Sequence, residues 1–279
     1  MVEMGQYNTL KINNEVDFGF YLDGGDWGEL LLPTRYVPKD MRERDEIEVF
    51  LYYDSEDRPI ATTETPRVTV GQCAFLKVTS SSPYGAFMDW GLSKDLLVPF
   101  KEQRVPMQVG KRYVAYVFLD ATGRIAASSK LDCFLEEENR GTFRPQQEVE
   151  LLIASRTDLG YKAVIEDTHI GLIHNADILQ PIEMGTRMRG YIKLIREEDN
   201  RIDLKLHATG RDAEDTLCDA ILDYLESEGG KSDLTDKSSP EAIYAQFQVS
   251  KSSYKKALGK LYKEKHILID NAAKQIVLL

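Results

Sequence analysis

The chain has 279 residues, 42% hydrophobic and 29% charged, which is the balance of an ordinary soluble globular protein, and its length suggests two or more domains. The net charge of −11 works against indiscriminate binding to nucleic acid or anionic membranes, so any polyanion contact should come from local basic patches. The sequence contains neither an apolar run long enough for a membrane helix nor a signal peptide, and we therefore expect a cytoplasmic protein without membrane contact.

Residues 1–64 are expected to form a small all-β domain. Alternating apolar residues and glycine turns predict strands at 17–23, 28–32, 47–53 and 58–63. Short strands with closely spaced turns favour a five-stranded antiparallel barrel.

The same order of strands returns twice, in residues 65–140 and 141–210. The second copy is predicted to have strands at 67–78, 85–89, 96–98, 112–119 and 124–128. The third is predicted to have strands at 148–154, 160–166, 170–174, 187–195 and 201–206. Between them, the glutamate-rich segment 135–143 is interpreted as a solvated linker.

Two landmarks support the three-fold repeat. One is an aromatic and glycine run, FGFYLD at 18–23 and YGAFMD at 84–89, with a weaker copy, LGYKAV, at 159–164. The other is an acid four residues before an arginine, in the pairs Asp54 and Arg58, Asp120 and Arg124, and Glu197 and Arg201. A repeat of this length indicates three small domains of one kind, of which the first is divergent.

Residues 211–279 have a helical period instead. Helices are predicted at 213–227, 241–247 and 251–265, with Ser239 and Ser250 as N-caps and Gly229 and Gly230 ending the first helix. A hairpin of 267–269 with 275–278 closes the chain. Three helices followed by a hairpin are the order of an α/β winged-helix domain.

The aromatic and glycine runs resemble the signature of the S1 RNA-binding domain, a five-stranded OB-type barrel. Three S1-like copies followed by a winged helix resemble the conserved virulence factor B family, also called the YitL family, whose members are RNA-binding regulators. The resemblance covers nearly the whole chain. It implies a mainly β, multidomain protein with three barrels and a C-terminal winged helix.

The resemblance also implies the RNA-contacting residues. They are Phe18, Tyr21 and Arg58 in the first copy, Tyr84, Phe87 and Arg124 in the second, and His174 and Arg201 in the third. In the third copy Leu159 and Lys162 replace the two aromatics, and in the first two copies Pro33 and Pro99 replace the histidine. Stacking of bases on exposed aromatics, with basic groups along the phosphates, is how proteins hold single strands. The alternative is that these aromatics belong to the core or to contacts between domains.

Two basic stripes could add contacts. Arg187, Arg189, Tyr191 and Lys193 alternate onto one strand face, near Lys162, which could follow a phosphate backbone or be only a solvated face. Lys256, Lys260 and Lys263, with Lys255 beside them, lie on the third C-terminal helix opposite Tyr254, Leu258 and Leu261. This helix could contact duplex nucleic acid or a protein, or simply be soluble.

The sequence lacks the common catalytic motifs, and its three cysteines and four histidines lack the spacing of zinc ligands. We therefore expect a non-enzymatic protein without metal or cofactor that binds single-stranded RNA and regulates gene expression after transcription. The alternatives are a DNA-binding regulator that uses the winged helix, and a protein-interaction scaffold with degenerate barrels.

Overall fold

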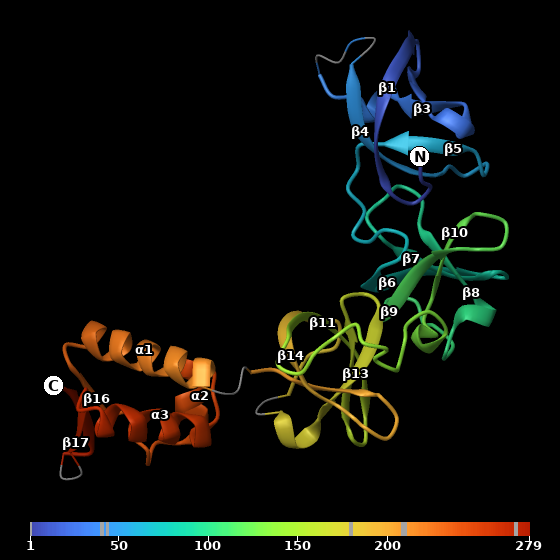
Figure 1. Ribbon diagram of the computed structural model, residues 1–279. Coiled ribbons are helices and arrows are strands. Elements are labelled where there is room, and N and C mark those ends of the chain that lie inside the picture. Colours follow the sequence, from blue (N-terminus) through green and yellow to red (C-terminus); the bar gives the residue numbers. More distant parts are fainter. Residues whose placement is uncertain (1, 40–41, 43–44, 179–180, 208–210, 271–272) are drawn as a thin grey trace.

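The computed structural model describes residues 2–39, 42, 45–178, 181–207, 211–270 and 273–279. In this part of the chain, three five-stranded sheets follow one another, and three helices with a short sheet come last (Figure 1). The predicted fold class is confirmed. The predicted end of the third copy at residue 210, and part of the turn of the C-terminal hairpin, lie outside the described residues.

The first sheet is a closed barrel. Its strands are β1 (Tyr7–Val16), β2 (Gly19–Asp23), β3 (Glu29–Pro33), β4 (Glu46–Tyr53) and β5 (Pro59–Thr62), in the order β1-β2-β3-β5-β4. The sequence reading missed β1 and also expected antiparallel pairing throughout. The closing pair is instead parallel, with Leu31 opposite Ile60.

The third sheet repeats this closed order. Its strands are β11 (Glu148–Thr157), β12 (Gly160–Ile165), β13 (His169–His174), β14 (Arg187–Ile195) and β15 (Ile202–Lys205). Here too the closing pair, β13 with β15, is parallel. Leu151, Ile153, Ala163, Ile173 and Leu204 are among the side chains that fill the interior.

The second sheet has the same strand order but is not closed by hydrogen bonds. It comprises β6 (Cys73–Ser82), β7 (Gly85–Asp89), β8 (Leu96–Pro99), β9 (Arg112–Leu119) and β10 (Ile125–Ser128), in the order β10-β9-β6-β7-β8. Strands β8 and β10 lie side by side at its edges. The prediction of a strand from residue 67 was wrong, because the strand begins at Cys73.

Each sheet has a bulge at the same place in its first strand, between Ile12 and Asn14, between Val78 and Ser80, and between Ile153 and Ser155. A bulge bends a strand and strengthens its twist, so that one long strand can pair with neighbours on both sides of a barrel. The common bulge is a third sign, besides the two sequence landmarks, that the copies share one architecture.

Neighbouring barrels are packed together. Phe50, Tyr52 and Ile60 of the first barrel belong to the apolar core of the second, where the Phe50 ring meets Trp90 edge to face at 5.7 Å. Burial raises the pKa of Tyr52 to about 12. The second and third barrels share a smaller cluster that includes Cys73 and Val164.

The segment 135–143 is not a solvated linker. Leu135 lies in the cluster between the second and third barrels, and Phe143 lies in the third core. Glu136 forms a backbone β-bridge with His169, and Glu138 forms one with Arg201. The segment therefore pairs through its backbone with the third barrel. Its glutamates set the composition, while its two apolar side chains and its backbone pairing determine its position.

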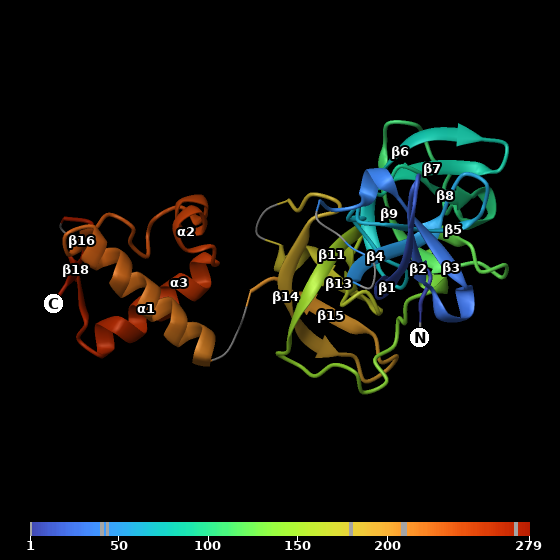
Figure 2. The ribbon, with the colours of Figure 1, turned by 90° about the horizontal axis from the view of Figure 1, so that it is seen from above.

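The winged-helix domain stands beside the barrels in both views (Figures 1 and 2). It contains α1 (Arg211–Ser227), α2 (Pro240–Phe247), α3 (Lys251–Lys263), β16 (Lys231–Ser232), β17 (Ile267–Asp270) and β18 (Gln275–Leu278). The predicted caps are confirmed, since Ser239 Oγ accepts from the amide of Ala242 and Ser250 Oγ from that of Ser253.

Candidate nucleic-acid interface

A glycine begins the second strand of every barrel. Gly19, Gly85 and Gly160 have φ between 150° and 155°, and a Cβ on any of them would lie 1.9–2.2 Å from a carbonyl oxygen of the third strand. Only glycine permits this approach of the two strands. The hairpin tip just before the glycine is thereby fixed, and it carries Phe18, Tyr84 or Leu159.

These tip side chains are exposed. The exposed fraction is 56% for Phe18, 77% for Tyr84 and 65% for Leu159. In the first barrel the ring of Phe18 meets the half-buried Tyr21 edge to face, with centroids 6.3 Å apart. Each of the first two barrels thus has an exposed aromatic at the hairpin tip and a second, half-buried aromatic on the following strand.

The second barrel carries a further exposed aromatic, Phe100, that is not among the residues predicted from the sequence. Phe100 follows β8, is 56% exposed, and donates its amide to the carbonyl oxygen of Tyr84 at 3.4 Å. The equivalent amides of Thr34 and Asn175 bond to Phe18 and Leu159. The repeat could have revealed Phe100, because it stands directly after Pro99 at the strand end that faces the tip glycine.

The acid and arginine landmark has a structural basis in the first two copies. One carboxylate oxygen of Asp54 accepts the amides of Glu56 and Arg58, and one of Asp120 accepts those of Thr122 and Arg124. These are side-chain turns that hold the hairpin before the last strand. In the third copy the acid that accepts the amide of Arg201 is Asp199, two residues before the arginine, and not Glu197, the acid four residues before it.

The arginine of each acid and arginine landmark is ion-paired. Arg58 pairs with Asp54 at 2.7 Å, and Arg201 with Glu137 at 2.9 Å. Arg124 reaches across to Asp57 of the first barrel at 3.2 Å. All three side chains nevertheless remain more than half exposed, which leaves them accessible to a phosphate.

In the third barrel, Glu137 joins two of the predicted residues. One carboxylate oxygen lies 3.1 Å from Lys162 Nζ and the other 2.9 Å from an Arg201 nitrogen. The sequence predicted both basic residues but not the acid between them, because Glu137 lies in the segment interpreted as linker.

His174 belongs to a separate polar cluster in the same barrel. Its Nε2 lies 3.0 Å from Oδ1 of the buried Asp203, to which Arg196 also donates at 2.7 Å. Burial alone would raise the pKa of Asp203, but hydrogen bonds from Arg196 and His174 outweigh it, and the pKa lies below its usual value. The imidazole is thus held at the strand end opposite Gly160.

The basic stripe on β14 is paired along its length. Arg187 contacts Glu150, Asp167 and the carbonyl of Cys73, and so links the third barrel to the second. Arg189 lies 3.1 Å from Glu148, and Lys193 lies 2.7 Å from Asp177. Of these, Arg189 is the most exposed, at 83% of its side chain.

The lysines of α3 divide into two groups. Lys255, Lys256 and Lys263 are exposed, whereas Lys260 bonds to Asp215 of α1, which raises the pKa of this lysine. Lys260 is therefore held against α1 and, contrary to the prediction from the sequence, does not share an exposed helix face with Lys256 and Lys263. Tyr254, Leu258 and Leu261 are buried as predicted.

Over the described ranges, no three His, Cys, Asp or Glu side chains are grouped so that they could hold a metal ion. A helix long and apolar enough to cross a membrane is also not found among these residues.

Comparison with known proteins gives matches at both ends of the chain. An S1 domain model matches residues 4–64, and a CvfB-like winged helix domain model matches residues 219–276. YitL of Bacillus subtilis is 29% identical over 96% of this chain and 91% of its own length. Conserved virulence factor B of Staphylococcus saprophyticus is 25% identical over 83% of this chain and 82% of its own. The predicted resemblance is confirmed. The S1 match falls on the first copy, the one whose sequence is expected to be divergent.

A crystal structure from Streptococcus pneumoniae is described as a multidomain protein with nucleic acid binding domains. It covers 99% of this chain and 98% of its own, with 23% sequence identity and a TM-score of 0.42.

Proposed function

We propose that this protein binds single-stranded RNA with its S1-type barrels and acts, without being an enzyme, in the control of gene expression after transcription in the cytoplasm. One observation carries the proposal. Tyr84 projects from a hairpin tip with 77% of its surface exposed, a large aromatic that the fold does not use for packing. Phe18 occupies the same position in the first barrel, also exposed.

The chemistry suits unpaired bases. A base stacked on an exposed aromatic contributes on the order of 1–3 kcal/mol with little dependence on sequence. Because Arg58, Arg124 and Arg201 are already ion-paired, a phosphate must compete with a carboxylate for each of them. We therefore expect every barrel to bind weakly, and the linked barrels to gain affinity from one another through effective concentration.

The test replaces both Tyr84 and Phe87 by alanine in the whole protein. We expect the affinity for a fluorescent single-stranded RNA to fall about tenfold or more, which corresponds to the loss of one stacked base. Tyr262→Ala removes a 53% exposed aromatic from α3 of the winged helix, so it should leave RNA binding unchanged if the barrels bind and weaken it if the winged helix does. A folded double variant that binds RNA as tightly as the wild type would refute the stacking mechanism.

The winged helix supports a second candidate, contact with duplex nucleic acid. This candidate rests on a group of exposed lysines on α3, namely Lys255, Lys256 and Lys263. Changing Lys256 and Lys263 to glutamine should weaken duplex binding if this candidate is right. If these changes abolish all binding while the double variant in the second barrel has no effect, the site lies on the winged helix.

A further inference from the structure

A cavity of about 540 Å³ lies between the second and third barrels. Its wall is built from strands of both, among them β6 and β9 on one side and β11 and β12 on the other. Most of its lining is apolar, including Val114, Leu131, Ile170 and Met184. Cavities of this size between domains, apolar with a few polar groups, are typical of sites for small organic ligands.

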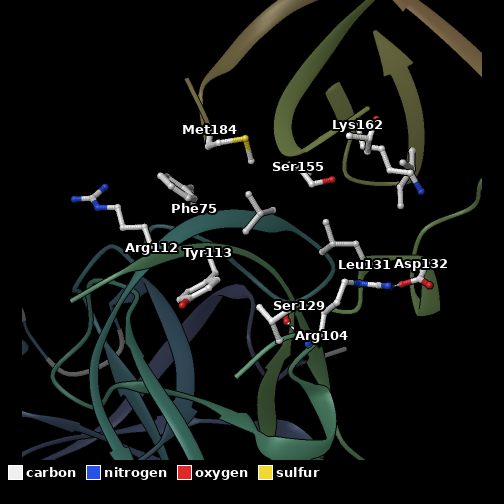
Figure 3. Close-up of a pocket in the computed structure, with 15 residues that line it drawn as sticks. Phe75, Arg104, Arg112, Tyr113, Ser129, Leu131, Asp132, Ser155, Lys162 and Met184 are labelled. Carbon is white, nitrogen blue, oxygen red and sulfur yellow. Dashed lines mark hydrogen bonds and ion pairs between the residues drawn. The ribbon is translucent and has the colours of Figure 1, made fainter. Parts of the chain in front are cut away.

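Two aromatic rings form part of the wall. Phe75 and Tyr113 lie on one side of the cavity, and Arg104 with its partner Asp132 lies on the other (Figure 3). Phe75 is held in place by the backbone of Gly185, where an added Cβ would lie 2.0 Å from its ring. Tyr113 accepts the amide of Gln108 through its hydroxyl at 3.1 Å. The rings are thus fixed before any ligand arrives, which limits the entropy that binding would lose.

The charge of the lining is opposite to that of the whole chain. Arg104, Arg112 and Lys162 are basic, and Asp132 is the acid among the lining residues, in a chain of net charge −11. Arg104 is paired with Asp132, and Lys162 is paired with Glu137, which lies outside the lining. Arg112 is exposed and points outward from the wall (Figure 3). An apolar cavity with aromatic walls and cations around it favours a planar, aromatic anion over a neutral lipid or an apolar peptide side chain.

From these features we propose that the cavity binds one nucleotide, with the base against Phe75 and Tyr113 and the phosphate near Arg104 and Lys162, in competition with their carboxylate partners. The inference rests on the proposed RNA contact, because Lys162 belongs both to the cavity and to the predicted RNA face of the third barrel. A strand that crosses from the second barrel to the third could place a nucleotide here, and a free mononucleotide offers the same chemistry.

The experiment fills the cavity. Ser155 is exposed and lines the cavity, so Ser155→Trp adds bulk there without removing a buried contact. Arg104→Gln removes a cation of the lining and serves as a second variant in case the first fails to fold. The controls are Thr9→Trp, at an exposed strand position of the first barrel, and Arg140→Gln, at a 74% exposed arginine outside the lining.

Each whole protein is titrated with adenosine 5′-monophosphate and, separately, with a fluorescent single-stranded adenosine octamer. If the nucleotide belongs to the strand, Ser155→Trp weakens octamer binding about tenfold and Arg104→Gln weakens it severalfold, while the controls do not. If a free nucleotide is the ligand, the two variants weaken binding of the monophosphate instead.

The proposal is overturned if both variants bind both probes as the wild type does. Loss of octamer binding in the Tyr84 and Phe87 variant, with unchanged binding in Ser155→Trp and Arg104→Gln, would leave the proposed function standing and remove the nucleotide cavity. If the wild type binds neither probe, both the proposed function and the nucleotide cavity are contradicted.

Discussion

The glycine that follows the hairpin tip is the residue on which the exposed tip side chain of each barrel depends. Sequence alone identified Gly19, Gly85 and Gly160 as equivalent, and their pairing with Pro33, Pro99 and His174 confirms that alignment. The sequence could not supply the reason, because the clash is with a carbonyl oxygen on another strand, 2.2 Å from a Cβ at position 85.

Replacing Gly85 by alanine should therefore destabilise the second barrel by about 2 kcal/mol or more, the scale of a strained backbone with a steric clash. Unfolding in urea, followed by the fluorescence of the buried Trp90, measures this free energy. Gly259→Ala, followed by helical circular dichroism, is the contrasting variant, because that helical position is open and alanine should stabilise the winged-helix domain by about 0.5–1 kcal/mol. Equal effects at the two positions would contradict the argument.

The repeat predicts the candidate site residues of the barrels, but it does not predict the carboxylates that pair with them. Asp57 lies opposite Arg124, and Glu137 opposite Lys162 and Arg201, only because of how the chain packs between copies. Local patterns indicate which side chains lie on a strand or turn. They do not indicate which side chains of a neighbouring domain come within 4 Å.

At the scale of elements, most strands and helices followed from period and turn residues, and the largest error was the segment 135–143. Its composition is that of a solvated stretch, yet its backbone pairs with the third barrel and Phe143 packs edge to face on His169 at 4.9 Å. Backbone pairing at a sheet edge has no side-chain signature, which explains the error.

The segment should loosen in acid. Burial lowers the pKa of His169, while the charge of Glu136 opposes this more weakly. A histidine with a lowered pKa stays neutral in the folded state, so its contribution to stability is present above about pH 6.5 and is lost as the pH falls through the folded value.

Amide hydrogen exchange at Ile170, whose amide bonds to Glu136, measures this opening. After correction for intrinsic rates, we expect weaker protection at pH 5.5 than at pH 7.5, and a smaller difference in His169→Gln. A variant with the same pH dependence as the wild type would show that another group controls the segment.

At the scale of the whole molecule, the chain divides into a packed series of barrels and a winged helix that stands beside them (Figure 2). Shared cores join the first barrel to the second and the second to the third. Where the third barrel meets the winged helix, the ring of His207 lies edge to face with that of Tyr244 on α2, with the ring centroids 6.1 Å apart.

This division predicts unfolding in separate steps. Both tryptophans, Trp27 and Trp90, lie in the first two barrels, whereas the three α-helices belong to the winged-helix domain. Tryptophan fluorescence and helical circular dichroism should consequently give different denaturation midpoints. Superimposable curves would show that the winged helix and the barrels unfold as one unit.

The most direct test of RNA contact by the barrel aromatics is a map of the contact itself. Single-stranded RNA carrying photoreactive uridine is crosslinked to the whole protein, and the modified peptides are identified by mass spectrometry. We predict crosslinks at the hairpin tips of the first two barrels, above all at Tyr84 and its neighbour Phe87. Crosslinks confined to α3 of the winged helix, with none on the barrels, would contradict this account.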